Sequence, residues 1–329
     1  MIKLDQRRVF FICDANHTSG MGHFLRCVSL ALQLRNQKYQ PTFIGEFSEA
    51  AIKLADYYSI DLQLSAQSIA QRLHCLPGAS RVILDSYQYS CDELPEQHCY
   101  VLIDDFCLQS HYPVAGVINF TYQAKQYDYC AKGASHQALG IDYFLAHPSL
   151  TDVPATFSPV IERILILIGS GDVFKLSSQI VVALQSIRAD LQIKVVGNQA
   201  SALSDSVNGS VQYVPVSPNV NQYYQWADFC ITSGGLAKYE CAYIGKPAAV
   251  ISLTEAEQSE SDDFAASQLC FNLGYRSTIT ADRLSKDLTN IIFQPQKRLA
   301  AYKACLQAFS GHSGRAITEF VTDCWECGA

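Results

Sequence analysis

The sequence predicts an α/β fold with two parallel-sheet domains. Its 329 residues correspond to about two domains of ordinary size. Short apolar segments alternate with helix-like stretches along the chain, which is typical of βαβ units and parallel sheets. A strand followed by a glycine-bearing loop opens the chain and recurs at RILILIGSGD, so we expect a second domain to begin there. We place one domain at residues 1–150 and the other at residues 151–329.

Each predicted strand is a short apolar run. Val9–Cys13 leads through a polar loop into a helix predicted from Gly22 to Leu34. TDVPATFSPVI, from Thr151 to Ile161, contains two prolines and little periodicity, which indicates an interdomain linker. The C-terminal helix is a candidate to pack back on the first domain. The other predicted strands are Pro41–Gly45, Val82–Asp85, Val101–Asp104 and Gly116–Asn119 in the first half, and Gln192–Gly197, Val211–Val214, Phe229–Thr232 and Ala248–Leu253 in the second.

The composition fits large buried cores and argues against several classes of partner. Apolar residues make up 49% of the chain and charged residues 17%, so disorder is not expected. Lysine plus arginine total 24 against 31 aspartate plus glutamate, a net charge of −7, which argues against binding to duplex nucleic acid. A small anionic ligand is compatible with this charge, because helix N-termini bind phosphate through backbone N–H groups. No segment approaches the roughly 18 apolar residues that a membrane span needs.

Thirteen cysteines are scattered along the chain. The first residues lack the apolar core and the cleavage site of a secretory signal, so we expect reduced thiols in a cytoplasmic protein. The one close pair is Cys324 and Cys327, in CWEC. A zinc site needs a second pair, or histidines at ligand spacing, and none follows. We therefore predict neither a metal site nor a cofactor.

The first candidate for chemistry is the segment Gly20-Met21-Gly22-His23, after the loop of the first strand. Glycines permit a tight turn and let a ligand approach the backbone. His23 falls in the first helical turn, where the helix dipole favours a neutral imidazole that could act as a general base. Arg26 lies on the same helix face and could meet an anionic group of a substrate. The alternatives are a packing or capping histidine and an ordinary solvated arginine.

Two loops of the second half are candidates for binding a diphosphate. A predicted strand ends in Ser233-Gly234-Gly235 and a helix follows, so free backbone N–H groups would face a ligand. Glu240 lies about one and a half turns into that helix and could accept hydrogen bonds from paired ribose hydroxyls. Gly169 and Gly171, in GSGD, belong to a second candidate loop. The alternative in each case is a tight strand-to-helix turn, with a surface glutamate in the first.

Acidic residues end several first-half strands. Asp14, Asp85 and the pair Asp104-Asp105 would line one rim of the first sheet, where an open parallel sheet binds ligands. Side chains alternate across a strand, so we expect one member of the pair to face the ligand. Each carboxylate alone could be a helix cap or a turn residue, whereas together they indicate a hydroxyl-rich, sugar-like substrate. We find no P-loop, nucleophile elbow, complete dinucleotide-binding fingerprint or Asp-x-Asp metal motif.

Taken together, these segments resemble a known family. ANHTSGMGHFLRCVSLALQL, VILDSYQYS, VLIDDF, the GSGD loop and ITSGGLAKYECAYIGKPAAVISL occur in the order found in the UDP-sugar hydrolases of the pseudaminic acid pathway. The wider group includes proteins of spore-coat polysaccharide synthesis. It is similar to inverting GT-B glycosyltransferases, notably the lipid II-forming N-acetylglucosaminyltransferase of peptidoglycan synthesis. The matching blocks extend from about Cys13 to Gly274, and GxGHxxR and SGGxxKYE are the specific ones.

The resemblance implies a GT-B fold, in which two Rossmann-like domains face each other across a cleft. It also implies a metal-independent hydrolase that acts on UDP-2,4-diacetamido-2,4,6-trideoxy-β-L-altropyranose and releases UDP and a free sugar for nonulosonic acid synthesis. His23 would assist the attack of water on the anomeric carbon. The UDP-sugar is the only partner implied, and no oligomeric state is predicted. The nucleotide side would consist of Gly169, Gly171, Ser233, Gly234, Gly235 and Glu240, and the sugar side of Asp14, Gly20, Gly22, Arg26, Asp85, Tyr87, Asp105 and Asn119.

Three positions depart from the family pattern. Cys13 stands where an arginine is expected, Ser86 stands where the dedicated hydrolases usually have histidine, and Ala146-His147 stands where an arginine before proline is usual. All three lie in or near the predicted sugar half. Two further hypotheses therefore stand beside the hydrolase. One is a glycosyltransferase that uses a UDP-sugar donor and an alcohol acceptor in surface polysaccharide synthesis, and the other is a non-catalytic nucleotide-sugar-binding protein.

Overall fold

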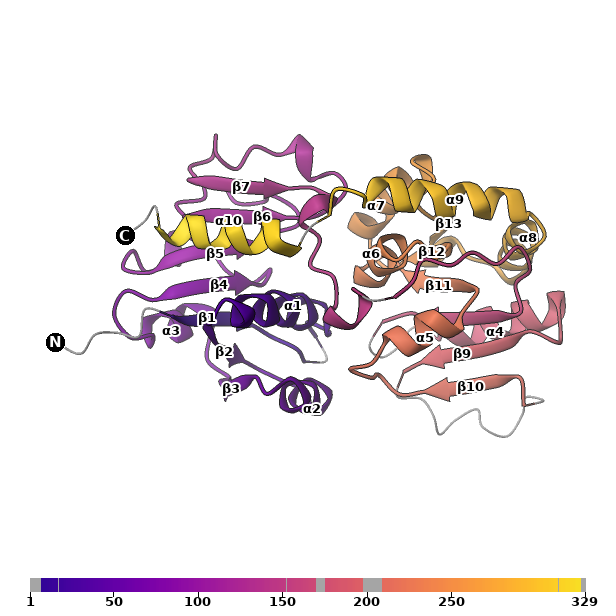
Figure 1. Cartoon of the computed structure of the whole chain (residues 1–329), viewed down its shortest axis with the longest axis horizontal. Coiled ribbons are helices and arrows are strands. Elements are labelled where there is room, and N and C mark those ends of the chain that lie inside the picture. Colours follow the sequence, from indigo (N-terminus) through magenta and orange to yellow (C-terminus); the bar gives the residue numbers. More distant parts are fainter. Residues whose placement is uncertain are drawn as a thin grey trace. The chain divides into compact units, whose positions relative to one another are not determined.

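The computed structural model describes residues 7–16, 18–151, 153–169, 175–197, 209–312 and 314–326. The chain divides into two compact units, each with its own sheet (Figure 1). Unit 1 contains Met1–Pro148 and Gly311–Ala329, so the C-terminal helix belongs to it, and unit 2 contains Ser149–Ser310. Gly171, predicted to bind the nucleotide, lies outside the described residues.

Unit 1 is built on a parallel sheet. Among the described residues, this sheet has seven strands in the order β3-β2-β1-β4-β5-β6-β7. The strands are β1 (Arg8–Cys13), β2 (Gln40–Gly45), β3 (Asp61–Leu64), β4 (Arg81–Asp85), β5 (Cys99–Ile103), β6 (Gly116–Asn119) and β7 (His136–Leu139). The α-helices are α1 (Gly22–Asn36), α2 (Glu49–Tyr58), α3 (Ile69–His74) and α10 (Gly314–Glu326), and the short 3-10 turns are η1 (Cys91–Glu93), η2 (Ala124–Gln126), η3 (Ile141–Tyr143) and η4 (Pro148–Leu150).

The central strands of unit 1 are nearly continuous apolar runs. In β1, RVFFIC, every residue after Arg8 is buried, and β4 and β5 are buried after their first residue. This pattern is typical of parallel strands that are covered on both faces. Ile12, Leu84 and Leu102 are fully buried in the core cluster of this unit. The order β1-β4-β5 brings the carboxyl ends of these three strands together, which positions the acidic residues that follow them.

Helix α10 packs on unit 1 although unit 2 precedes it in the chain. It contacts α1, β5 and β7 (Figure 1). A Cβ on Gly116 of β6 would collide with Cys324 Sγ of α10, so glycine permits this close approach. The Trp325 ring lies edge-on to Tyr39 with centroids 5.3 Å apart, and the Arg81 guanidinium lies 5.5 Å from the indole. Cys324, half of the CWEC pair, is therefore a packing residue.

Unit 2 has a second parallel sheet. Among the described residues, it has six strands in the order β10-β9-β8-β11-β12-β13. Its core includes Ile164, Ile180, Phe229 and Ile251, all fully buried. The strands are β8 (Arg163–Leu167), β9 (Gln192–Val196), β10 (Val211–Val214), β11 (Phe229–Ser233), β12 (Ala248–Ser252) and β13 (Phe271–Tyr275). The helices are α4 (Leu176–Ile187), α5 (Asn221–Trp226), α6 (Leu236–Tyr243), α7 (Glu255–Ala266), α8 (Ala281–Ile292) and α9 (Pro295–Ala308), with the 3-10 turn η5 (Arg276–Thr278).

A buried arginine ties the first residues of unit 2 to its helices. Arg298 of α9 is 1% exposed and donates hydrogen bonds to the carbonyl oxygens of Ile291 and Ile292, at 2.8 and 2.6 Å. Its Nη2 also donates to the carbonyl oxygen of Pro159, at 2.7 Å. Arg298 thus satisfies carbonyl groups at the C-terminus of α8, which have no partner within the helix. The same side chain fixes the segment that enters β8.

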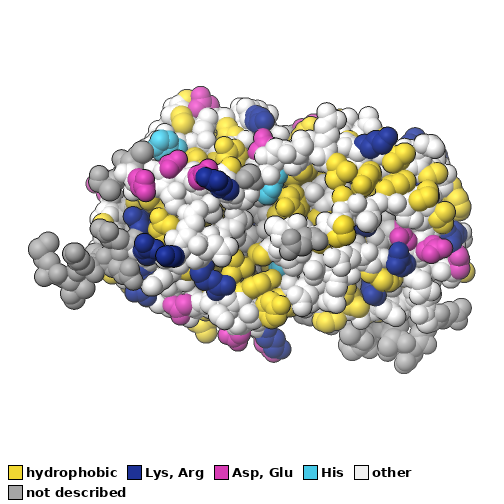
Figure 2. Space-filling view, in the orientation of Figure 1, with side chains coloured by type: hydrophobic (Ala, Val, Ile, Leu, Met, Phe, Trp, Pro, Cys, Tyr) yellow, Lys and Arg dark blue, Asp and Glu magenta, His cyan; other side chains and the backbone are white. Residues whose placement is uncertain are grey.

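Three observations concern a membrane, a nucleic acid and a metal ion as partners. Within the described ranges, no helix is long and apolar enough to cross a membrane. On the face drawn in Figure 2, several basic side chains gather at one side of unit 1, and elsewhere basic, acidic and apolar side chains are interspersed. The described residues contain no group of three or more His, Cys, Asp or Glu side chains that could hold a metal ion.

Candidate functional site

The loop between β1 and α1 is shaped by its own hydrogen bonds. Asn16 Oδ1 accepts hydrogen bonds from the backbone N–H groups two and three residues later, each at 2.9 Å. Gly20 has a φ of +69°, a left-handed conformation that favours glycine. A Cβ on Gly22 would meet no atom of the described residues within 4 Å, so the backbone is accessible there. This loop places His23 in the first turn of α1.

His23 is held by Asp85, the last residue of β4. Its Nδ1 lies 2.6 Å from Asp85 Oδ1, and the Asp85 side chain is fully buried. A carboxylate only accepts hydrogen bonds, so we infer that Nδ1 carries the proton and that Nε2 has the free lone pair. Arg26 Nη2 lies 3.3 Å from the same Nδ1, but it donates to Asp85 Oδ1 at 2.6 Å. His23 is thus in the tautomer that a general base needs.

Arg26 joins two buried carboxylates. Its Nε and Nη2 donate to the two oxygens of Asp85, at 2.6 Å each, and its Nη1 donates to both oxygens of Asp105, at 2.8 and 2.9 Å. Burial alone would lower the pKa of Arg26, but the charges of Asp105 and Asp85 hold that pKa well above its usual value. Every nitrogen of the guanidinium therefore has an internal carboxylate partner.

The carboxylate of Asp85 is held in its charged form. Burial alone would raise the pKa of Asp85, but the charge of Arg26 and the hydrogen bonds from Arg26 and His23 keep that pKa well below its usual range. Tyr87 completes the group: its hydroxyl donates to Asp105 Oδ2 at 2.5 Å, and its ring lies edge-on to His23 with centroids 4.6 Å apart. We call His23, Arg26, Asp85, Tyr87 and Asp105 the histidine cluster. Its net charge is −1 while His23 is neutral, so a proton gained by the imidazole brings the cluster to neutrality.

Two other predicted sugar-side residues have internal partners. Asp14 Oδ1 accepts hydrogen bonds from Arg72 Nη1, at 2.8 Å, and from the backbone N–H that follows β2, at 2.7 Å. Asn119 is fully buried, and its Nδ2 donates to the Tyr129 hydroxyl at 2.8 Å. Its Oδ1 accepts from the backbone N–H and the hydroxyl of Thr121, at 3.0 and 2.7 Å. The structure brings neither residue into the histidine cluster.

The adjacent pair Asp104-Asp105 is divided between two roles. Asp105 belongs to the histidine cluster, whereas Asp104 stabilises the turn after β5. Asp104 Oδ1 accepts hydrogen bonds from the backbone N–H groups of Phe106 and Cys107, at 2.7 and 3.0 Å. Its Oδ2 accepts from the Tyr112 hydroxyl at 2.6 Å. Both residues follow the end of β5, so the conformation of this turn, and not the alternation of side chains along the strand, divides the pair.

The three positions that depart from the family pattern are all packed inside unit 1. Cys13 is 1% exposed and is the register partner of Asp85 on the neighbouring strand. Ser86 Oγ accepts a hydrogen bond from the backbone N–H of Gln88 at 3.0 Å. His147 is buried, and burial lowers its pKa to about 4, so its imidazole is neutral at pH 7. Cys13 and Ser86 adjoin the histidine cluster, Cys13 across the strand pair and Ser86 between Asp85 and Tyr87 in the chain.

In unit 2, the glycine turn lies between β11 and α6. Gly235 precedes the first residue of α6, and no side chain caps this helix. Its first N–H groups are therefore available to an anion. A Cβ on Gly234 would lie 2.8 Å from Glu257 Cβ, so only glycine fits there without a shift. Gly169, with a φ of +82°, is beside this turn, because a Cβ on it would lie 4.0 Å from Ser233 Oγ. The structure thus brings the predicted residues Gly169, Ser233, Gly234 and Gly235 together.

Glu240 is buried rather than on the surface. It is 7% exposed, and its Oε2 accepts a hydrogen bond from the Tyr224 hydroxyl at 2.7 Å. Burial raises the pKa of Glu240 to about 7, although the bond from Tyr224 acts in the opposite direction. The carboxyl group therefore changes its charge near neutral pH, unlike an ordinary surface glutamate.

Sequence reasoning missed two glutamates that adjoin this turn. Glu257 Oε2 accepts a hydrogen bond from the backbone N–H of Leu253 at 2.7 Å, next to Gly234. Glu260 Oε2 lies 2.8 Å from Lys238 Nζ, and its Oε1 accepts a hydrogen bond from the Tyr239 hydroxyl. The sequence carries a signal for Glu257: TEAE, Thr254 to Glu257, follows a buried strand and is a capping pattern that predicts the start of a helix.

The comparisons with known proteins follow the same division into units. Residues 163–314 match the glycosyltransferase family 28 C-terminal domain, and no curated protein matches the chain. Three solved structures cover almost the whole chain. MurG of Acinetobacter baumannii is 14% identical over 96% of this chain and 99% of its own, with a TM-score of 0.63. LpCGTa in complex with UDP is 13% identical over 96% and 99%, with a TM-score of 0.64. The glycosyltransferase VinC in complex with dTDP is 13% identical over 97% and 98%, with a TM-score of 0.60.

The chain has the GT-B fold. The expectation of two Rossmann-like parallel-sheet domains is confirmed, with one sheet in each unit. In this GT-B chain, the family 28 match covers most of unit 2, which contains the glycine turn and Glu240. The histidine cluster belongs to unit 1, outside the matched residues. The matched domain belongs to a glycosyltransferase family, whereas the sequence blocks resemble the pseudaminic acid hydrolases.

Proposed function

We propose that this protein is a glycosyltransferase that uses a UDP-sugar donor and an acceptor with a free hydroxyl group. The hydrogen bond between His23 Nδ1 and Asp85 carries the proposal, because it holds the imidazole as a general base. The family 28 match over residues 163–314 supports binding of a nucleotide sugar by unit 2. Two structural neighbours, LpCGTa and VinC, were solved with UDP and dTDP, which supports a nucleoside diphosphate as the group bound.

Unit 2 would hold the nucleotide through backbone and side-chain groups that are already in place. The uncapped N–H groups at the start of α6 suit the diphosphate, because the positive end of the helix dipole faces it. Gly169 and Ser233 lie side by side at this position. Glu240 would accept hydrogen bonds from the ribose hydroxyls. Its Oε2 would then either lose the hydrogen bond from the Tyr224 hydroxyl or accept both bonds at once.

Unit 1 would supply the base. His23 Nε2 takes the proton of the acceptor hydroxyl, and the hydroxyl oxygen forms a bond to the anomeric carbon of the sugar. The bond between that carbon and the diphosphate oxygen breaks, and UDP leaves with the electron pair. The backbone N–H groups at the start of α6 stabilise the charge that develops on UDP. Asp85 keeps His23 oriented, and the charge of the resulting imidazolium is balanced by the histidine cluster.

A second candidate is the hydrolase, in which water replaces the acceptor and the sugar is released. The order of the GxGHxxR and SGGxxKYE blocks favours it. The substrate would be the UDP-linked 2,4-diacetamido-2,4,6-trideoxy sugar of nonulosonic acid synthesis, and the protein would act in the cytoplasm. Both candidates use the same base, the same donor class and the same leaving group, so they differ only in the nucleophile.

One experiment separates the candidates. The purified protein is incubated with a panel of UDP-sugars that includes the trideoxy sugar, with and without added alcohol acceptors, and release of UDP is followed. Release that requires an acceptor and yields a glycosylated product supports the transferase. Release in buffer alone, with a free sugar as product, supports the hydrolase. Tight binding of UDP without turnover of any donor would contradict both and favour a nucleotide-sugar-binding protein.

A further inference from the structure

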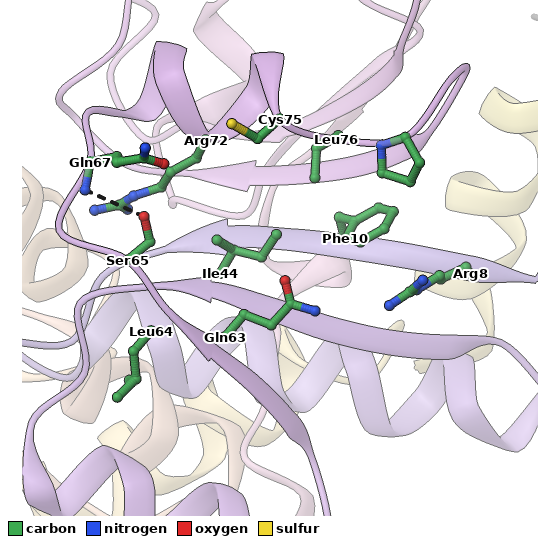
Figure 3. A pocket seen from close by; sticks show the side chains of 11 residues that line it. Arg8, Phe10, Ile44, Gln63, Leu64, Ser65, Gln67, Arg72, Cys75 and Leu76 are labelled. Carbon is green, nitrogen blue, oxygen red and sulfur yellow. Dashed lines mark hydrogen bonds between the residues drawn. The ribbon is translucent and has the colours of Figure 1, made fainter.

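A pocket of unit 1 lies outside the histidine cluster, beside α3. It has a volume of about 360 Å³, which is the size of small-molecule sites in proteins. Phe10 of β1 and Ile44 of β2 lie at its centre (Figure 3). The pocket continues to the segment after β3, where Ser65 and Gln67 add polar groups. Its lining thus combines an apolar floor with polar ends.

The charges that line this pocket are all positive. Arg8 and Arg72 belong to the lining, and no aspartate or glutamate among the described residues lines it. This is unusual for a chain whose net charge is −7. The amide side chains of Gln63 and Gln67 add donors that could bind oxygen atoms. The lining therefore selects for an anion.

Arg72 has an unused donor at one end of the pocket. Its side chain is only 4% exposed, and its Nη1 donates to Asp14 at 2.8 Å. Arg72 Nε is buried and has no hydrogen-bond partner among the described residues. A buried donor without a partner is costly, and cationic donors are the costliest. A ligand oxyanion in the pocket would supply the missing acceptor.

Arg8 lies at the other end (Figure 3). Its guanidinium lies 5.1 Å from the centre of the Phe10 ring, over the apolar floor. In the register of β1 and β2, Arg8 is the partner of Gln40, four residues before Ile44. At about 3.3 Å per residue, the backbone of Arg8 lies roughly 13 Å from that of Ile44 along the strands, and the Arg8 guanidinium extends back over Phe10 toward Ile44. Two cations at the ends of an apolar floor suit an elongated ligand with an acid group at each end.

We propose that this pocket is a second ligand site of unit 1, which binds a small organic dianion of the dicarboxylate type. One carboxylate pairs with Arg72 and the other with Arg8, while the apolar middle of the ligand lies on Phe10 and Ile44. The proposal does not depend on the proposed function, because the pocket shares no residue with the histidine cluster or with unit 2.

Cys75 provides the test, because its exposed thiol lines the pocket, whereas Cys130 is exposed elsewhere in unit 1. The full chain is treated with iodoacetamide, and alkylation of each cysteine is followed by mass spectrometry of the peptides. We expect millimolar adipate to slow alkylation of Cys75 at least threefold and to leave Cys130 unchanged. Adipamide, its neutral analogue, should have no effect. Absence of protection, or equal protection of both cysteines, would overturn the proposal.

Matched variants test the two arginines. Arg8→Gln should raise at least fivefold the adipate concentration that gives half of the full protection of Cys75. Arg72→Gln should have the same effect, and its melting temperature is measured to show that the variant is folded. Arg7→Gln makes the same change of charge at an exposed neighbour that does not line the pocket, and it should behave as wild type. Equal protection in Arg8→Gln and wild type would refute the role of Arg8. Protection by inorganic phosphate at the same concentration as adipate would refute the two-ended dianion.

Discussion

Glu240 should make the stability of unit 2 depend on pH, and Glu240→Gln should remove that dependence. The side chain is buried against Tyr224, and burial raises its pKa from the ordinary value of 4.5 to about 7. A group whose pKa is raised by folding stabilises the native state at low pH, and this contribution is lost as the pH rises through the folded pKa. The loss therefore begins near pH 4.5 and is complete above pH 7. Glutamine has the shape of the protonated acid and can still accept the hydrogen bond from Tyr224.

The size of the effect follows from the two pKa values. At roughly 1.4 kcal/mol for each tenfold change, moving the pKa from 4.5 to about 7 corresponds to about 3 kcal/mol of unfolding free energy above pH 7. Glu240→Gln should therefore be within about 1 kcal/mol of wild type at pH 4 and about 3 kcal/mol more stable at pH 8. For a unit of this size, the second difference raises the Tm by roughly 6 to 12 °C.

The assay is thermal unfolding of wild type and variant between pH 4 and pH 8. Tyr224→Phe serves as a second variant, because loss of its hydrogen bond to the carboxylate should raise the pKa of Glu240 further. In Tyr224→Phe, the pH-dependent loss of stability should therefore begin at the same pH as in wild type and should end at a higher pH. A constant difference in Tm between Glu240→Gln and wild type at all pH values would refute the reasoning. Glu255→Gln, at an exposed position of α7, controls for loss of one negative charge.

Three further predictions concern catalysis and stability. Asp85→Asn should lower kcat by roughly 10²–10⁴ with little change in KM, because an amide can donate a hydrogen bond to Nδ1 and favour the wrong tautomer of His23. An unchanged kcat in steady-state kinetics would count against this role of Asp85. Arg298→Met should lower the unfolding free energy by about 3 kcal/mol, because the carbonyl oxygens of Ile292 and Pro159 lose their donor. The same change at the half-exposed Arg283 should cost under about 0.5 kcal/mol in urea unfolding. Gly234→Ala should cost about 1–3 kcal/mol, since its Cβ would press on Glu257, and a Tm equal to that of wild type would contradict the close packing.

The sequence predicts the central strands of both sheets and the edge strand β10, but it misses the other three edge strands, β3, β7 and β13. β1, β4, β11 and β12 are apolar runs, because parallel strands in the middle of a covered sheet are buried on both faces. β3 reads DLQL and is mostly exposed, and β7 reads HQAL and is only partly buried. Neither has the apolar signal of a core strand, and each is a strand because its neighbour offers unpaired backbone groups. β13 was missed in the same way, with FNLGY at the other edge.

The sequence predicts which residues belong to the candidate site, but it does not predict which of them form ion pairs and hydrogen bonds with one another. The motif GMGH and the acidic strand ends point to one rim, and the order β1-β4-β5 does bring Asp85 and Asp105 to Arg26. Asp14 follows a strand in the same way, yet its carboxylate pairs with Arg72 of α3. Such partners lie 58 to 79 residues apart in the chain, so they depend on packing that local patterns do not encode. The burial of Glu240 was hidden for the same reason.

The central claim is that His23 removes a proton from the nucleophile that displaces UDP. The most direct measurement is the single-turnover rate of UDP release from the active donor by wild type and His23→Gln, with the affinity for UDP measured by calorimetry in parallel. We expect the rate to fall by about 10²–10⁴ in His23→Gln and the affinity for UDP to stay within about twofold, because His23 belongs to unit 1, whereas the proposed nucleotide site lies in unit 2. An unchanged rate of UDP release in His23→Gln would contradict the account.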